Sequence, residues 1–394
     1  MSGALEALYP ELNKHYQHLT HAEVSHFLEH GWFVIPNSMN RKYLDRWMED
    51  LWVRMDMDPE DKSTWRTEYQ HLPRHREVPA AEFCPEAWQK IVEVCGGGIR
   101  TEDRIDASRE TWYGDAFIVN LGTEEKARPD YQSPHPSQRD GWHIDDDFFR
   151  LFLDSSQVSL TLLHCYTDIP EKGGGTWLAE DGMSYVNQYL YDHREGFDPP
   201  FPFMETVCGN IRECKQFAQL TAKKGDIIVT HGRIPHAVSD NLLHFARVIA
   251  NPHIALKEPF NLDRPDGNYS LVEQAILNSI GRTSIPHFTP LRERMTWYPR
   301  NQGTKRNKAD AEVARMEAAA VTKGLPKESV NSFYQRKGTK DWEEFERRNG
   351  FDKEKPPSGE RVEGENKMRG LNGVSWSHKP SVPLPSTTPA VVAK

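Results

Sequence analysis

A stretch of regular alternation at residues 158–167 most constrains the fold of this chain. Apolar Val158, Leu160 and Leu162 take every second position there, with Thr161 on the other face, which is the period of a β-strand. Other extended runs are separated by Gly, Pro and Asp, and they do not alternate strictly with helices. The pattern favours an antiparallel barrel or a double-sheet jelly roll. The other runs cover 111–121, 226–230 and 246–256.

Helical patterns flank these runs. Near the N-terminus Thr20 can cap a first helix and Gly31 can end it, a short apolar strand follows at 32–35, and Asn37 or Asn40 opens a second helix. Residues 308–323 are rich in Ala and charge and predict another helix. We therefore expect a mainly β protein with helical additions.

The 394 residues divide into four predicted parts. A helical N-terminal part, 1–110, packs on a jelly-roll core at 111–300, and a helical and aromatic segment follows at 301–351. Residues 352–394 consist mostly of Lys, Glu, Gly, Pro and Ser, a composition that buries little and predicts disorder.

Composition excludes several classes of protein. Acids outnumber bases by 58 to 49, so the chain lacks the excess of Lys and Arg that binds nucleic acid. It has neither a run of about 18 apolar residues nor the pattern of a signal peptide, so we expect a cytoplasmic protein without a membrane partner. The five cysteines form no CxxC pair and predict neither a zinc site nor a redox dithiol.

The pair His143 and Asp145 is the first candidate site. Residues i and i+2 of a strand face the same side, so both side chains can bind one metal ion. With a second His from another strand they would complete the facial triad of non-haem Fe(II) oxygenases, which leaves coordination positions open. Because His-x-acid pairs also arise by chance, the assignment depends on a matching His in the downstream sequence.

The downstream segment contains two candidates for the second His. A Gly225-Asp226 turn leads into an apolar strand, followed by His231 and His236, and then by Arg247. A guanidinium pairs with two carboxylate oxygens at once. Arg247 is thus a candidate anchor for the distal carboxylate of 2-oxoglutarate, an oxoacid that would chelate the metal through its other end.

In this order of residues the chain resembles the phytanoyl-CoA dioxygenase-like family of Fe(II)/2-oxoglutarate-dependent oxygenases. The resemblance also includes the strand entry at 30–36 and the Gly-rich turn at 173–177. It implies a double-stranded β-helix (jelly roll, cupin-like) core, Fe(II), 2-oxoglutarate as cosubstrate, and O2. The family spacing to Arg247 implies that His236 is the metal ligand and that His231 is structural.

The sequence does not identify the residue that would bind the 2-oxoglutarate carboxylate together with Arg247. Where the family often has a hydroxyl residue, two positions after the distal His, this chain has Val238. We expect Thr161 to replace it, although Tyr166 or Ser239 would serve as well. Asn120 could bind the other carboxylate, or it could simply close a strand.

The resemblance implies oxidation of a C–H bond by hydroxylation, or by desaturation or cyclisation. Because basic residues near the motif are spread out, we expect a small metabolite, from secondary metabolism or derived from an amino acid, rather than the phosphate-rich acyl-CoA. The alternatives are an acyl-CoA 2-hydroxylase of the same family, and a non-catalytic or zinc-binding protein on the same barrel.

Aromatic residues gather in the C-terminal third. They either pack on the outside of the barrel or cover the mouth of the site, in which case Trp342 and Phe345 would contact substrate. The group is Phe333, Tyr334, Trp342, Phe345 and Phe351.

Overall fold

The computed structural model describes residues 16–96, 104–107, 110–146, 148–197, 211–295 and 302–349, and only the backbone of 302–307. Phe351 and the predicted disordered tail, 352–394, lie outside these residues.

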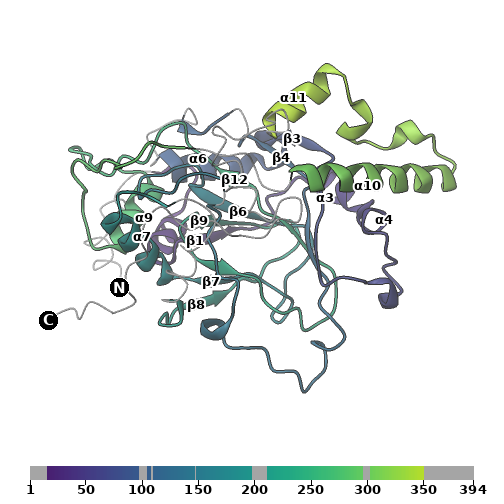
Figure 1. The fold of residues 1–394 in the computed structure, drawn as a ribbon, viewed down its shortest axis with the longest axis horizontal. Helices are drawn as coiled ribbons and strands as arrows, with labels where there is room; N and C mark the ends of the chain where they lie inside the picture. The colour runs from purple at the N-terminus through teal and green to yellow at the C-terminus, as the bar shows by residue number, and fades with distance from the viewer. Residues whose placement is uncertain are drawn as a thin grey trace.

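A seven-stranded sheet forms the centre of the molecule (Figure 1). Its hydrogen-bonded order is β1-β9-β6-β11-β5-β2, and β12 also pairs with β6. Each of these pairs is antiparallel, and β6 and β9 are buried along their whole length. The strands are β1 (Trp32–Ile35), β2 (Tyr69–His71), β5 (Ile118–Asn120), β6 (Leu160–Cys165), β9 (Ile227–His231), β11 (Arg247–Ala250) and β12 (His253–Ile254).

A smaller sheet has the order β10-β7-β8, formed by β10 (His236–Ala237), β7 (Trp177–Ala179) and β8 (Phe217–Gln219). His143 adds to it through an isolated antiparallel bridge to His236. From β5 onward the chain passes back and forth between the two sheets. A further pair joins β3 (Glu77–Pro79) to β4 (Trp112–Gly114).

The expectation of a sheet-rich protein with helices is confirmed. Over the described residues the two sheets remain separate and do not close into one barrel, so the double-stranded β-helix stays a prediction.

The predicted run 111–121 was wrong as a single strand. It forms β4 and β5, separated at Asp115. The carboxylate of Asp115 accepts hydrogen bonds from the backbone N–H groups of His75 (2.7 Å) and Arg76 (2.9 Å). This side chain therefore ties the chain to a neighbouring segment at the point where the ladder is interrupted.

The predicted run 246–256 is also divided, but its register continues. Ala250 pairs with His164 and His253 with Thr161, so β11 and β12 follow one line along β6. Pro252 lies between them and has no N–H to give to a ladder, while its carbonyl accepts from Leu162.

The helices pack around the sheet. The predicted ends of the first are confirmed, since Thr20 forms a capping box with Glu23, and Gly31 ends it at φ 79°. Asn40 caps the second helix. The helices are α2 (His21–His30), α3 (Arg41–Met48), α4 (Leu51–Met55), α5 (Ala80–Phe83), α6 (Pro85–Gly96), α7 (Gly182–Asp192), α9 (Leu271–Ser279), α10 (Gln302–Thr322) and α11 (Lys340–Arg348), with 3-10 turns η2 (Lys62–Thr64), η4 (Pro136–Gln138), η5 (Lys327–Ser329) and η6 (Phe333–Arg336). None of the helices in the described ranges is both long and apolar enough to cross a membrane.

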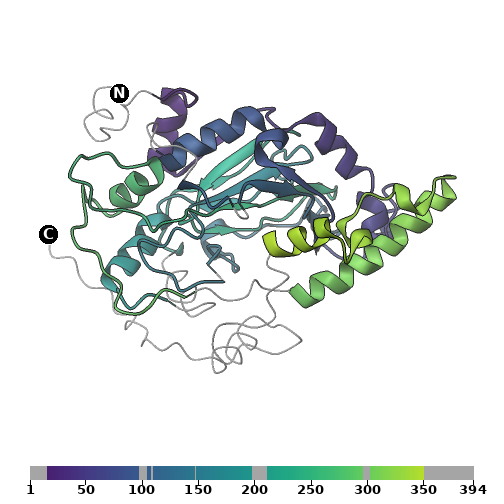
Figure 2. The ribbon, with the colours of Figure 1, turned by 90° about the horizontal axis from the view of Figure 1, so that it is seen from above.

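Helix α10 packs on α4 at one side of the molecule, and α11 lies beside β3 and β4 (Figures 1 and 2). A buried ion network joins this segment to the rest. The guanidinium of Arg54 on α4 contacts Asp115 at 3.1 Å and Glu312 of α10 at 2.8 Å. His75 lies 3.0 Å from the same Glu312 carboxylate and 2.8 Å from the hydroxyl of Ser332.

We predict that Glu312→Ala destabilises the protein by about 3 kcal/mol, because removing one partner leaves a buried charge poorly compensated. Denaturant unfolding measures the change. The control on the same helix is Asp310→Ala, whose partner Lys337 is about half exposed (47%), and we expect about 0.5 kcal/mol or less. Equal losses for both variants would contradict a special role of the buried network.

Candidate metal centre

The structure brings His143, Asp145 and His236 together. Among the described residues they form a group whose possible ligand atoms all lie within 4.8 Å of one another. His236 Nε2 and Asp145 Oδ2 are 3.5 Å apart, and the two imidazole centroids are 4.3 Å apart. Two nitrogens and one carboxylate are the donor set of a facial triad.

Backbone pairing between the two histidines builds this group. His143 N donates to the carbonyl of His236 (2.9 Å), and His236 N donates to the carbonyl of His143 (2.8 Å). The bridge places one residue of each segment directly opposite the other, and directly opposed residues of an antiparallel pair have their side chains on the same face. Asp145 lies two residues after His143, but at a bend and not on a strand, where Asp146 N donates to the carbonyl of Ile144. The prediction that the two residues sit on one strand was therefore wrong, although the structure does bring their side chains together.

Both rings are also oriented by local carbonyls. The Nδ1 of His143 lies 2.8 Å from the carbonyl of Gly141, and the Nδ1 of His236 lies 3.2 Å from that of Ile234. A carbonyl can only accept, so each Nδ1 carries the proton and each Nε2 keeps its lone pair. This is the tautomer that metal-binding histidines generally adopt, with the other nitrogen held by a backbone oxygen.

The protonation states of His236 and Asp145 suit the binding of a metal cation. Burial, with a contribution from His143, lowers the pKa of His236 to about 4, so its ring is neutral near pH 7. Burial alone would raise the pKa of Asp145, but His253 and His236 bring the pKa well below its usual value. Neutral imidazoles and an ionised carboxylate are the forms that bind a metal.

His231 has no nitrogen left for a metal. Its Nδ1 accepts the backbone N–H of Arg233 (3.0 Å), so its Nε2 donates to the carbonyl of Val272 (3.0 Å). The ring is buried and packs near Phe27 of α2, and burial lowers its pKa to about 3. The geometry thus favours His236 over His231 as the ligand.

Arg247 is buried, with 2% of its surface exposed, yet its Nε and Nη1 have no hydrogen-bond partner among the described residues. Burial lowers its pKa to about 10, and Tyr69 and Cys165 offset this in part. Leaving a buried charge unpaired costs several kcal/mol. Within the described part of the chain no carboxylate forms an ion pair with this guanidinium, so its Nε and Nη1 are available to an anionic ligand.

The other expected cosubstrate residues are engaged with the protein. Asn120 lies opposite Arg247 in the sheet, but its amide donates to the carbonyl of Ser239 (3.2 Å) and accepts from Gly122 (2.9 Å). The hydroxyl of Thr161 lies 3.3 Å from Asp145 Oδ2. That of Ser239 donates to the carbonyl of Gly175.

Tyr166 has a hydroxyl without a partner among the described residues, but alternation along β6 puts it on the opposite face from Thr161. The second contact of a cosubstrate thus remains a prediction.

Trp342 and Phe345 are not brought to the triad. They lie in a buried cluster with Ala309 and Tyr334, on the side of the molecule formed by α10 and α11 (Figure 1). Packing against α10 and η6 accounts for their burial, and a contact with substrate stays a prediction.

Sequence reasoning missed His253. Its Nε2 lies 3.1 Å from Asp145 Oδ2, although it is more than a hundred residues away along the chain. Part of the signal was present in the sequence, since His253 falls in the predicted extended run 246–256, an even number of residues after Arg247.

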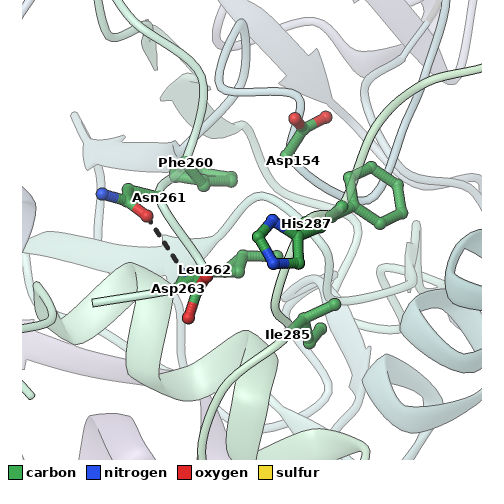
Figure 3. Close-up of a pocket in the computed structure, with 8 residues that line it drawn as sticks. Asp154, Phe260, Asn261, Leu262, Asp263, Ile285 and His287 are labelled. Carbon is green, nitrogen blue, oxygen red and sulfur yellow. Dashed lines mark hydrogen bonds between the residues drawn. The ribbon is translucent and has the colours of Figure 1, made fainter. Parts of the chain in front are cut away.

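A pocket of about 260 Å³ lies elsewhere in the protein (Figure 3). None of the three residues of the metal group lines it. Its lining is Asp154, Phe260, Asn261, Leu262, Asp263, Ile285, His287 and Phe288.

No protein-family model matches the chain. A search of curated proteins likewise finds no similar sequence. The resemblance inferred from the motifs therefore stays an inference from this chain's own residues.

Solved structures do show likenesses. The non-heme alpha ketoglutarate dependent epimerase SnoN from nogalamycin biosynthesis has 13% identity and a TM-score of 0.32, over 74% of this chain and 92% of that one. AviO1 from Streptomyces viridochromogenes has 14% sequence identity and a TM-score of 0.34, over 62% of this chain and 98% of that one. HygX from Streptomyces hygroscopicus, solved with nickel and 2-oxoglutarate, has 11% sequence identity and a TM-score of 0.31, over 61% of this chain and 88% of that one. TM-scores this low establish neither fold nor function, so function must be argued from the site.

We predict that His143→Ala, Asp145→Ala and His236→Ala each weaken binding of Fe(II) or Co(II) by more than the 10- to 100-fold typical of losing an outer-shell partner. Anaerobic titration calorimetry measures the affinity. His231→Ala should lower the melting temperature, because it opens a buried site, but keep the metal affinity. If His231→Ala lost the metal while His236→Ala bound it normally, the assignment of the distal ligand would be reversed.

Proposed function

We propose that this protein is an Fe(II)/2-oxoglutarate-dependent dioxygenase that oxidises a C–H bond of a small metabolite. His143, Asp145 and His236 would hold the iron, and Arg247 would bind the distal carboxylate of the oxoacid. Iron with the oxoacid and O2 would supply the oxidising power for that bond. We also propose that the protein belongs to the phytanoyl-CoA dioxygenase-like family.

The observation that carries this proposal is the buried guanidinium of Arg247, whose Nε and Nη1 have no hydrogen-bond partner among the described residues. Ile249 lies opposite Cys165 in the sheet, and residues two apart share a face. Arg247 therefore lies on the same face as Thr161, the residue that contacts Asp145. A dicarboxylate that binds the metal at one end would need a cation for its other end. Arg247, buried on the same sheet face as the residue that contacts Asp145, could provide that cation.

Spacing along the strand supports the same arrangement. His253, which contacts Asp145, is six residues beyond Arg247 in a continuous register. Six residues of strand span about 20 Å between backbone positions, and a guanidinium, a metal ion and a five-carbon dicarboxylate would all have to fit along this length.

A zinc hydrolase would leave Arg247 without a role. Burying a guanidinium without a partner is costly, and a bound carboxylate would offset that cost, so Arg247 favours the oxygenase over the hydrolase. A non-catalytic protein on the same barrel would have little reason to keep Arg247 together with all three candidate metal ligands.

The charges near the motif favour a small metabolite over acyl-CoA. Lys126 pairs with Glu68 (2.7 Å) and Asp240 (2.9 Å), and Arg139 also pairs with Asp240 (2.9 Å). Two basic residues that could have bound phosphates are thus neutralised within the protein. Hydroxylation, desaturation and cyclisation of such a metabolite all fall within the proposal.

Anaerobic addition of Fe(II) and then 2-oxoglutarate to the full chain tests the proposal. The expected result is a weak visible charge-transfer band that needs both components. Tight binding of zinc with no band, and no effect of 2-oxoglutarate on the iron-loaded protein, would refute it.

We predict that Arg247→Ala raises the dissociation constant for 2-oxoglutarate about a hundredfold, because a charge-assisted bidentate pair contributes about 2–3 kcal/mol. The charge-transfer band provides the titration signal, and Fe(II) affinity in the absence of the oxoacid should change little. As a control, Arg46→Ala alters an exposed Arg, paired with Glu49, and should change neither value. An unchanged constant in Arg247→Ala would remove this residue from the site.

A further inference from the structure

The carboxylate of Asp145 is held by two side chains of the main sheet. His253 Nε2 lies 3.1 Å and Thr161 Oγ1 lies 3.3 Å from the same oxygen, Oδ2. The two residues are direct partners in the β6–β12 register. Asp145 itself follows the strand-like segment of His143, so these contacts connect the small sheet's metal group to the large sheet.

His253 differs from the two candidate ligands. It is outside the group whose ligand atoms lie within 4.8 Å of one another. A nitrogen that contacts a carboxylate at 3.1 Å does so as an N–H donor, and it then has no lone pair for a metal. His253 is therefore placed to act on the metal through Asp145.

We infer that His253, assisted by Thr161, is a positioning residue that fixes the rotation of the Asp145 carboxylate. This inference rests on the proposed function. Oδ2, the oxygen that both residues contact, is also the oxygen 3.5 Å from His236 Nε2. The two contacts therefore hold the side of the carboxylate that faces a candidate ligand nitrogen, as outer-shell partners of metal ligands do.

The strength of the two contacts is unequal. The 3.1 Å contact of His253 is within the usual range of an N–H···O hydrogen bond, whereas the 3.3 Å contact of Thr161 is long for an O–H···O hydrogen bond. Outer-shell partners of metal ligands typically contribute 10- to 100-fold in metal affinity. Loss of His253 should therefore have the larger effect.

The test compares His253→Leu with His253→Gln in the full chain. Leu removes the donor, whereas Gln keeps an N–H that can reach the carboxylate but is a poor metal ligand. Co(II) is titrated anaerobically by calorimetry, and its visible spectrum reports the coordination number. We expect Co(II) affinity to fall roughly 10- to 100-fold in His253→Leu, with a changed spectrum, to be mostly retained in His253→Gln, and to fall less in Thr161→Val.

The chain offers a matched control. His30 contacts the carboxylate of Glu180 at 3.0 Å, so His30→Leu removes the same kind of pair away from the metal group and should leave Co(II) binding unchanged. Melting curves of the metal-free variants identify any that fail to fold, and Thr161→Val then tests the same carboxylate independently.

Two results would overturn the inference about His253, and a third, different result would overturn the proposed function. If His253→Leu binds Co(II) as the wild type does, His253 has no positioning role. If His253→Gln loses as much affinity as His253→Leu, His253 ligates the metal directly. If the wild type binds no metal, the proposed function itself fails.

Discussion

The antiparallel bridge between His143 and His236 is the interaction on which the site depends. Its two backbone hydrogen bonds join segments far apart in the chain and extend the small sheet by one residue. Backbone pairing sets the distance between the rings, and the carbonyls of Gly141 and Ile234 set which nitrogen is protonated. The pairing of the two histidines is thus a product of main-chain geometry, whereas Asp145, at a bend two residues later, is held by its contacts with His253 and Thr161.

Two buried arginines differ in how their charge is compensated. Arg54 and Arg247 are almost equally buried, at 1% and 2% exposure. Arg54 meets Asp115 and Glu312, so its charge is compensated and it fastens α10 to the core. Arg247 lacks hydrogen-bond partners for Nε and Nη1 within the described residues. Because an uncompensated buried charge is costly, this difference is the reason for proposing that Arg247 binds an anionic ligand.

Local sequence signals predicted the local elements well. The cap at Thr20, the end at Gly31 and the alternation after Val158 each depend on a few neighbouring residues, and the structure has the elements they predicted. The break at Asp115 could not be predicted, because it depends on hydrogen bonds from residues some forty positions earlier. His253 was missed for the same reason, since no spacing rule links it to Asp145. Hydrogen bonds between groups distant in sequence leave no periodic pattern to detect.

One continuous strand register connects the two halves of the proposed site. Arg247 and His253 lie on the same face because they are an even number of residues apart and because the register of β11 continues into β12. Pro252 interrupts the ladder without shifting it, since its carbonyl still accepts from Leu162. A slip by one residue between the two positions would turn one side chain to the opposite face. The position of Arg247 relative to Thr161 and His253 is therefore set by pairing with β6, so the hydrogen bonds that build the core also set the distance from Arg247 to the two residues that contact Asp145.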